Sequence, residues 1–248
     1  MNELLTILER ECTNKEFSLK ELLIKSDYKK SKLYEWLNEL IKANKVVKIA
    51  ENVYKLKEHK EISVPKEIMT LSERLKKIIT RKFKFTALSI LLPFAHHTLY
   101  SINYLIYVEK GSGEDFKEAI SKLDPKLTVL LDPKKEDVLL MINEADRNRI
   151  LIIRENAYFY GKEYGIAYPE TAFVDLYFEV SRDKIPFMKT DIKEILKELI
   201  LKNLINYSRL MRYAHERKLT AEIKNIFLEL SKEIKLPEGG LNVLQKVS

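Results

Sequence analysis

Residues 28–57, YKKSKLYEWLNELIKANKVVKIAENVYKLK, decide the fold of the N-terminal part of the chain. The first half of this stretch carries an apolar stripe at helical spacing, formed by Leu33, Leu37, Leu40 and Ile41. The second half has two β-branched runs on either side of Glu51 and Asn52, residues that favour a tight turn. The stretch therefore predicts a helix that leads into a β-hairpin.

Two further helices are predicted upstream of this stretch. Residues 2–12 place leucine and isoleucine at helical spacing, and residues 18–26 begin with Ser18 followed by Glu21, which is a capping box. Three helices and a two-stranded ribbon within about sixty residues follow the order of a winged helix-turn-helix. We therefore predict a winged helix-turn-helix DNA-binding domain over residues 1–58.

The N-terminal end of the third helix is where a groove-reading helix meets bases and phosphates. The candidate DNA-binding residues there, with one more from the hairpin, are Lys29, Lys30, Ser31, Lys32, Tyr34 and Lys48. Lysines at this end oppose the helix dipole at a cost of roughly 0.3–1 kcal/mol each, which DNA phosphates would offset. Lysine rather than arginine favours phosphate contact over guanine readout. The alternative is that these lysines only fill an exposed turn, and Glu51 at the hairpin tip argues against phosphate contact by the wing.

A charged, aperiodic segment at residues 58–65, EHKEISVP, predicts a domain boundary. The second domain is predicted over residues 66–236 as a mixed α/β domain with a helical C-terminus, so the fold class is α+β (α/β). Its predicted strands are residues 102–110, 127–131 and 146–156, with a helix at 113–123. Its predicted C-terminal helices are residues 168–180, 191–205, 206–218 and 220–234, with Thr220 as the cap of the last.

The helix predicted at residues 168–180, YPETAFVDLYFEV, places the carboxylate Asp175 inside an apolar run. Pro169 and Glu170 suit its first turn, where a missing N–H costs nothing and a negative charge meets the helix dipole. A carboxylate in a packed helix must be paired or hydrogen-bonded, because an uncompensated buried charge costs several kcal/mol. The expected partners lie on the later helices, and they are Arg209, Arg212, Tyr213 and Arg217.

A resemblance to a known family rests on two segments within this arrangement. The first is the run that contains Pro169, Glu170, Phe173, Val174, Asp175 and Leu176; the second contains Tyr213, Ala214 and Arg217. Together with the N-terminal winged helix, they resemble the abortive-infection AbiEi family of antitoxin-like transcriptional regulators, including its archaeal relatives. The resemblance implies a DNA-binding autoregulator that counters a nucleotidyltransferase-like toxin. Glu170, Asp175, Tyr213 and Arg217 become candidates for structural contacts or a partner interface.

The net charge of +7 is compatible with a polyanionic partner, but it is not concentrated in the first 69 residues, which carry only +2. The densest basic run is residues 72–85, SERLKKIITRKFKF, which predicts either a solvated helix face or a strip that contacts phosphate. Double-stranded DNA is the expected partner, and the resemblance implies a toxin as a second partner. A homodimer is the expected assembly, because one short helix with three lysines is a small footprint on DNA.

Signals for catalysis or metal binding are weak. Gly111, Ser112 and Gly113 predict a plain strand-to-helix turn, because no closely spaced pair of acids follows to hold Mg²⁺. A restriction-type nuclease would need acids with a nearby lysine, and the available residues Glu109, Lys110, Asp132 and Asp137 lack convincing spacing. The four histidines, His59, His96, His97 and His215, and the single Cys12 form no metal-ligand or nucleophile motif.

We therefore expect no enzyme activity, cofactor or metal, with a nuclease or a pure protein-interaction module as the alternatives to a regulator. One cysteine, no signal peptide and no apolar stretch of membrane-spanning length predict a cytoplasmic protein without membrane association.

Overall fold

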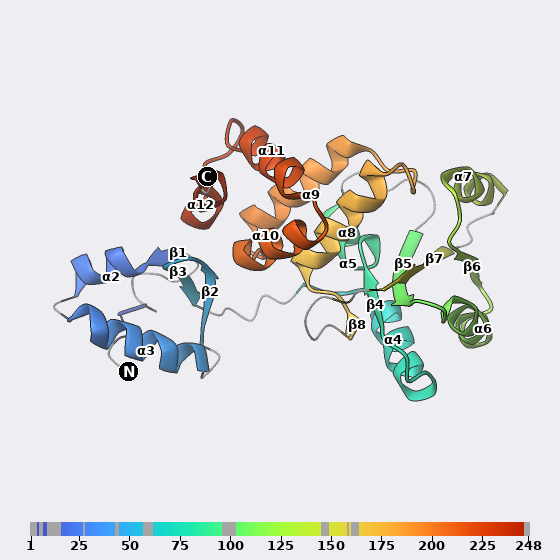
Figure 1. Cartoon of the computed structure of the whole chain (residues 1–248), viewed down its shortest axis with the longest axis horizontal. Helices are drawn as coiled ribbons and strands as arrows, with labels where there is room; N and C mark the ends of the chain where they lie inside the picture. Colours follow the sequence, from blue (N-terminus) through green and yellow to red (C-terminus); the bar gives the residue numbers. More distant parts are fainter. Residues whose placement is uncertain are drawn as a thin grey trace. The chain divides into compact units, whose positions relative to one another are not determined.

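The structure is a computed structural model, which describes residues 4, 7–8, 16–26, 28–42, 45–56, 62–95, 103–144, 149–157, 159 and 164–245 (Figure 1). The chain has the predicted α+β class and forms two compact units. Unit 1 combines residues 1–61 with residues 200–248, and unit 2 contains residues 62–199. The first break falls inside the predicted linker. The second domain predicted for residues 66–236 differs from this division, because residues 200–236 pack with the N-terminal unit.

The helical half of the winged helix forms around one apolar cluster. Helix α2 (Leu19–Lys25) begins with the predicted capping box, in which the Glu21 amide donates to Ser18 Oγ at 3.1 Å and the Ser18 amide donates to Glu21 Oε2 at 2.7 Å. Helix α3 (Lys30–Lys42) buries the predicted stripe through Leu33, Leu37 and Leu40. Of the first predicted helix, the described residues include Leu4 and Leu8, which are helical and fully buried in the same cluster.

The predicted hairpin consists of β2 (Val46–Ala50) and β3 (Val53–Leu56), which pair antiparallel. Asn52 adopts a left-handed φ of 56° in the two-residue turn, a conformation that asparagine adopts more often than most residues. A third strand, β1 (Glu16–Ser18), pairs with the other edge of β3, so the sheet order is β1-β3-β2. Three residues are too few to show a strand pattern, and β1 was not predicted.

Helices from the C-terminal end of the chain complete unit 1. They are α10 (Tyr207–Glu216), α11 (Thr220–Leu230) and α12 (Glu238–Gln245), and α10 and α12 contact the hairpin or β1. Three hydrogen bonds join this C-terminal segment to the sheet: Asn206 Nδ2 donates to the Lys48 carbonyl at 3.2 Å, Lys55 Nζ donates to the Asn203 carbonyl at 2.9 Å, and the Gly239 amide donates to Glu16 Oε2 at 2.9 Å. Thr220 is the first residue of α11, and Leu219 occupies the cap position that Thr220 was predicted to fill.

Two neighbouring glycines of α12 allow a matched test of this packing. A Cβ on Gly239 would lie 2.4 Å from Tyr207 Cδ2, whereas a Cβ on Gly240 would meet nothing closer than 3.4 Å. We expect Gly239→Ala to destabilise unit 1 by about 1–3 kcal/mol through overpacking. Gly240→Ala should be neutral or stabilising by up to about 1 kcal/mol, because alanine favours the helix. Urea unfolding followed by the fluorescence of Trp36, the single tryptophan, measures both; equal effects would contradict the close approach of α12 to Tyr207.

Unit 2 is built on a five-stranded mixed sheet of order β6-β7-β5-β4-β8. The strands are β4 (Phe83–Thr86), β5 (Asn103–Glu109), β6 (Leu127–Leu131), β7 (Arg149–Asn156) and β8 (Gly165–Ile166). Strand β5 runs parallel to β7 and antiparallel to β4, and the other neighbours are parallel. The predicted strands β5, β6 and β7 are confirmed, whereas β4 and β8 were not predicted.

Helices cover both faces of this sheet. Helices α4 (Lys66–Ile78) and α6 (Gly113–Leu123) contact each other and one face, and α5 (Leu88–Leu91) and α8 (Pro169–Ser181) contact each other and the opposite face (Figure 1). The remaining elements are α7 (Lys135–Glu144), α9 (Lys189–Leu201) and the short 3-10 turn η1 (Leu92–Phe94). The layered arrangement buries both faces of α8, which explains why its sequence is apolar almost all round.

Candidate nucleic-acid interface and buried ion pairs

The N-terminal end of α3 presents a cationic surface. Lys29, Lys30, Ser31 and Lys32 are all exposed, and the first turn of α3 contains no acidic residue. The positive end of the helix dipole therefore adds to three lysine charges at one place. This end of the helix can contact phosphate.

Aromatic side chains support two of these lysines. Lys32 Nζ lies 5.0 Å from the centre of the Trp36 ring, and Trp36 itself packs edge-on against Tyr28 with ring centres 4.9 Å apart. Lys30 Nζ lies 6.0 Å from the centre of the Tyr34 ring. Trp36 is half-buried against the core cluster. Such cation–π contacts favour lysine positions above the ring faces, where the ammonium groups stay in solvent.

Tyr34 was predicted as a DNA-contacting residue, and its hydroxyl has a partner inside the protein. It donates to Asn52 Oδ1 at 2.9 Å and so ties α3 to the turn of the hairpin. The ring is half-buried against the core cluster. Tyr34 therefore positions α3 relative to the hairpin, which we call the wing (residues 46–56).

The wing offers less cationic surface than its sequence suggests. The side chain of Lys48 is exposed, while that of Lys55 is buried and donates to the Asn203 carbonyl. Glu51 is exposed at the turn. Of the two lysines in the wing, Lys48 alone is exposed.

Asp175 forms a buried ion pair with a strand that the sequence did not reveal. Lys84 Nζ on β4 lies 3.2 Å from Asp175 Oδ2, and the Thr86 hydroxyl donates to the same oxygen at 2.7 Å. All three side chains are fully buried. The predicted need for a partner is confirmed by Lys84 and Thr86, which were not among the expected partners. Arg209, Arg212, Tyr213 and Arg217 belong to unit 1 and Asp175 belongs to unit 2, so the contact predicted between them stays a prediction.

A second buried pair lies one helical turn further along α8. Arg154 Nε on β7 donates to Glu179 Oε2 at 3.0 Å, and the Tyr107 hydroxyl on β5 donates to Glu179 Oε1 at 2.9 Å. The same guanidinium also donates to the carbonyls of Pro133 at 2.6 Å and Lys184 at 3.2 Å. Arg154 therefore joins the sheet, α8 and the loops after β6 and α8.

The other three candidates for structural or partner contacts are separated by the division into units. Glu170 is buried in the first turn of α8 in unit 2, at the predicted position. Tyr213 is buried on α10 in unit 1, where Arg217 Cζ lies 6.0 Å from the centre of its ring. The structure thus places Tyr213 and Arg217 together at the C-terminal end of α10, where Arg217 is the cap residue.

The basic run at residues 72–85 is not one solvated face. Helix α4 ends at Ile78, and Lys84 lies in β4 with its side chain completely buried. Two of the other cations form ion pairs: Lys76 pairs with Glu73 at 2.8 Å, and Arg81 lies 3.6 Å from Glu109. Arg74 Nη1 donates to the Leu123 carbonyl at 3.0 Å. Phe83, Lys84 and Phe85 alternate between apolar and polar, and this pattern could have predicted the strand from the sequence.

The turn around Ser112 is structural. Ser112 Oγ donates to the Glu109 carbonyl at 2.5 Å, and the Gly113 amide donates to Glu155 Oε1 at 2.8 Å. Backbone hydrogen bonds from Gly111 and Gly113 lower the pKa of Glu155. This confirms the predicted strand-to-helix turn.

The acids considered for a nuclease also have local structural partners. The Lys134 amide donates to Asp137 Oδ2 at 2.9 Å, and Asp132 Oδ1 lies 3.8 Å from Arg154 Nη1. Among the described residues, no cluster of three or more histidine, cysteine, aspartate or glutamate side chains could hold a metal ion. His215 is exposed, and Cys12, His59, His96 and His97 lie outside the described residues.

The part of the chain that the structure describes contains no helix that is both long and apolar enough to cross a membrane.

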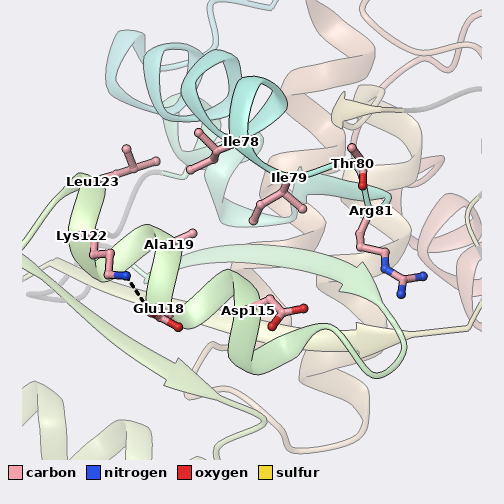
Figure 2. A pocket seen from close by; sticks show the side chains of 9 residues that line it. All are labelled: Ile78, Ile79, Thr80, Arg81, Asp115, Glu118, Ala119, Lys122 and Leu123. Atoms are coloured by element: carbon pink, nitrogen blue, oxygen red, sulfur yellow. Dashed lines mark hydrogen bonds and ion pairs between the residues drawn. The ribbon is translucent and has the colours of Figure 1, made fainter.

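An open groove of about 620 Å³ lies between the C-terminal end of α4 and helix α6 (Figure 2). One end is apolar, with Ile78, Ile79 and Leu123, and the other end carries Arg81 and Asp115. The ion pair between Glu118 and Lys122 lies along α6 at its rim, and Lys122 lowers the pKa of Glu118. The groove combines an apolar surface with charges of both signs.

These features define an α+β protein with a winged-helix unit and a layered α/β unit. The chain belongs to a family of unknown function, DUF6577, whose family model matches residues 32–233. The match begins within α3 and extends through both units as far as the segment after α11. No curated protein and no solved structure matches the chain.

Proposed function

We propose that this protein is a DNA-binding transcriptional regulator. The observation that carries the proposal is the exposed N-terminal end of α3, where Lys29, Lys30 and Lys32 add to the positive end of the helix in a winged-helix arrangement. Phosphate contacts of this kind position a recognition helix on the duplex. A single helix end with three lysines is a small footprint, so two copies of the chain bind as a dimer.

The antitoxin role rests on the resemblance to AbiEi-like regulators. In this role the protein represses its own promoter and counters a nucleotidyltransferase-like toxin encoded nearby. The supporting features are the winged-helix unit and the segment around Asp175 in α8. Co-expression of the chain with a neighbouring nucleotidyltransferase-like gene tests this role: growth should be rescued, and unrelieved toxicity would contradict it.

Replacing Lys29, Lys30 and Lys32 together by alanine tests the DNA interface. We expect weaker binding to the DNA upstream of the gene, with the slope of log K against log salt reduced by up to about 2.7 per bound copy of the chain, because each phosphate contact contributes about 0.9. Fluorescence anisotropy at several salt concentrations measures the slope.

The matched control replaces three exposed lysines of unit 2, Lys77, Lys82 and Lys126, and removes the same charge. Its slope should stay close to that of the unmodified chain. A reduced slope in the control, with no change in the α3 variant, would assign the phosphate contacts to the basic run instead. Mg²⁺-dependent cleavage of the DNA would support the nuclease alternative.

A further inference from the structure

Strand β6 forms one edge of the sheet in unit 2, and its apolar side chains remain partly exposed (Figure 1). Leu127 is buried, whereas residues 128–131 are half-buried. Helix α7, at the same side of unit 2, exposes Leu139 and Leu140 by 39% and 56%. Among the described residues, β7 is the only strand that pairs with β6. An edge strand of the sequence LTVLL has no charge or proline inside it, so it is open to pairing with another strand.

The outer side of β6 presents backbone hydrogen-bonding groups on alternate residues. The Asp132 amide donates to the Ile153 carbonyl of β7 at 2.9 Å. Because the backbone groups of a strand alternate between its two sides, the even-numbered residues of β6 face β7 and the odd-numbered residues face away from it. The N–H and C=O groups of Val129 and Leu131 therefore lie on the outer side, together with the C=O group of Leu127. The Leu127 N–H donates within the turn before the strand.

These outward groups match those of a second copy of the same strand in antiparallel orientation. When Val129 lies opposite Val129 of the second copy, the two residues exchange both backbone hydrogen bonds. In the same register, the Leu131 N–H of each copy reaches the Leu127 carbonyl of the other copy. The arrangement has a two-fold axis, which is the commonest symmetry of a pair of identical chains. A register centred on an even-numbered residue would place backbone groups that already face β7 at the centre.

The charges that flank β6 fit this register. The sequence Asp-Pro-Lys stands on both sides of the strand, at residues 124–126 and 132–134. In the antiparallel pair, Lys126 of each copy stands opposite Asp132 of the other copy, and both residues are exposed. Asp132 Oδ1 also lies 3.8 Å from Arg154 Nη1, but the Asp132 side chain is still 52% exposed, so its carboxylate can meet a lysine as well.

The surroundings of β6 favour a closed pair of copies over a longer assembly. Pro125 and Pro133 bracket the strand, and proline has no N–H to donate, so the ladder of hydrogen bonds ends with the strand. The opposite edge of the described sheet is β8, which has two residues and offers little for a further copy to pair with. Pairing through β6 therefore stops at two copies.

We propose that β6 pairs with β6 of a second copy of this chain, antiparallel and centred on Val129, so that one sheet continues across both copies. A single pair of strands is a small interface, so the dimer forms reversibly at micromolar concentrations. The surface depends on unit 2 alone. The use of this dimer on DNA rests on the proposed function, which requires two copies of the chain.

Sedimentation velocity of the full chain tests the assembly. The mass should rise from 29.2 kDa toward twice that value as the concentration increases through the micromolar range. Residue-resolved hydrogen exchange should show slower exchange of the Val129 and Leu131 amides in the dimer, whereas the Thr128 and Leu130 amides, which face β7, should change little. A monomer at every concentration, or a dimer that leaves the exchange of Val129 and Leu131 unchanged, would overturn the surface.

Charge variants test the register. Lys126→Glu places a glutamate opposite Asp132 at both ends of the interface, and it should raise the Kd of the dimer by about tenfold, because two cross-strand pairs change from attractive to repulsive. Adding Asp132→Asn removes the repulsion and should recover most of the affinity, since asparagine tolerates the left-handed φ of 44° at this position. The control Lys77→Glu makes the same charge change at an exposed position on α4 and should leave the Kd unchanged. An equal Kd for Lys126→Glu and the unmodified chain would overturn the register.

DNA affinity is measured separately on the same variants. Lys126→Glu should bind DNA more weakly than the unmodified chain, and the double variant with Asp132→Asn should recover DNA binding together with the dimer. A chain that forms the dimer and does not bind DNA would contradict the proposed function, while the mass and exchange results would still support the surface. A chain that binds DNA and fails the mass and exchange tests would overturn the surface and leave the proposed function standing.

Discussion

Asp175→Ala is expected to destabilise the protein by about 3–5 kcal/mol, because it leaves the Lys84 ammonium buried without its carboxylate partner. At about 2–4 °C per kcal/mol for a protein of this size, Tm should fall by about 10 °C. The Thr86 hydroxyl also loses its acceptor, which adds to the cost. Thermal unfolding followed by far-UV circular dichroism measures the change.

A fully apolar replacement separates the cost of breaking the ion pair from the net contribution of the intact ion pair to the stability of the protein. The variant Lys84→Met, Thr86→Val, Asp175→Leu removes all three polar groups together. Replacement of a buried ion pair by apolar residues is often neutral or stabilising, so this variant should be more stable than Asp175→Ala. The reverse order would mean that Lys84 finds another partner when Asp175 is removed. Unchanged stability of Asp175→Ala with lost toxin neutralisation would instead assign Asp175 to a partner interface.

Glu179→Ala should have an effect of similar size, about 3–5 kcal/mol. The substitution leaves the Arg154 guanidinium without its closest carboxylate and removes the acceptor of the Tyr107 hydroxyl. Tyr107→Phe removes only the hydroxyl and should cost about 1 kcal/mol, which makes it the matched control. Urea unfolding of both variants gives the comparison, and equal losses would show that the Arg154–Glu179 pair contributes little.

Arg154→Lys tests whether the guanidinium joins separate segments. A lysine ammonium cannot reproduce the directions in which Arg154 reaches Glu179, Pro133 and Lys184, because the guanidinium is a planar fork with five donors. Hydrogen exchange should therefore become faster in the loops after β6 and α8, while β5 keeps its protection. Uniform exchange across unit 2 would contradict this role.

Elements that depend on neighbours in sequence were predicted well. The capping box at Ser18 and Glu21 and the turn at Glu51 and Asn52 join residues within four positions, so the chemistry of each is visible in a short stretch. The apolar stripe of α3 follows from helical periodicity in the same way. The strands β5, β6 and β7 are long enough for their apolar runs to show.

Short elements were missed because their stability comes from distant partners. Strand β1 has three residues and β8 has two, and each pairs with a strand far away in the sequence. Strand β4 lies within the basic run that was predicted to form a solvated helix face or a strip that contacts phosphate, although its Lys84 side chain is fully buried. A lysine is almost never fully buried unless it is paired, and the pair is visible only in three dimensions.

The sequence by itself determined the winged-helix order, the cationic end of α3 and the need of Asp175 for a partner, because propensity, capping and the cost of a buried charge act on a residue and its neighbours. Only the tertiary structure decided which partner Asp175 has, that Lys84 is buried, and that residues 200–248 complete the N-terminal unit. These outcomes depend on which apolar surfaces and polar groups come into contact, and a contact between segments far apart in the sequence leaves no pattern in either segment alone.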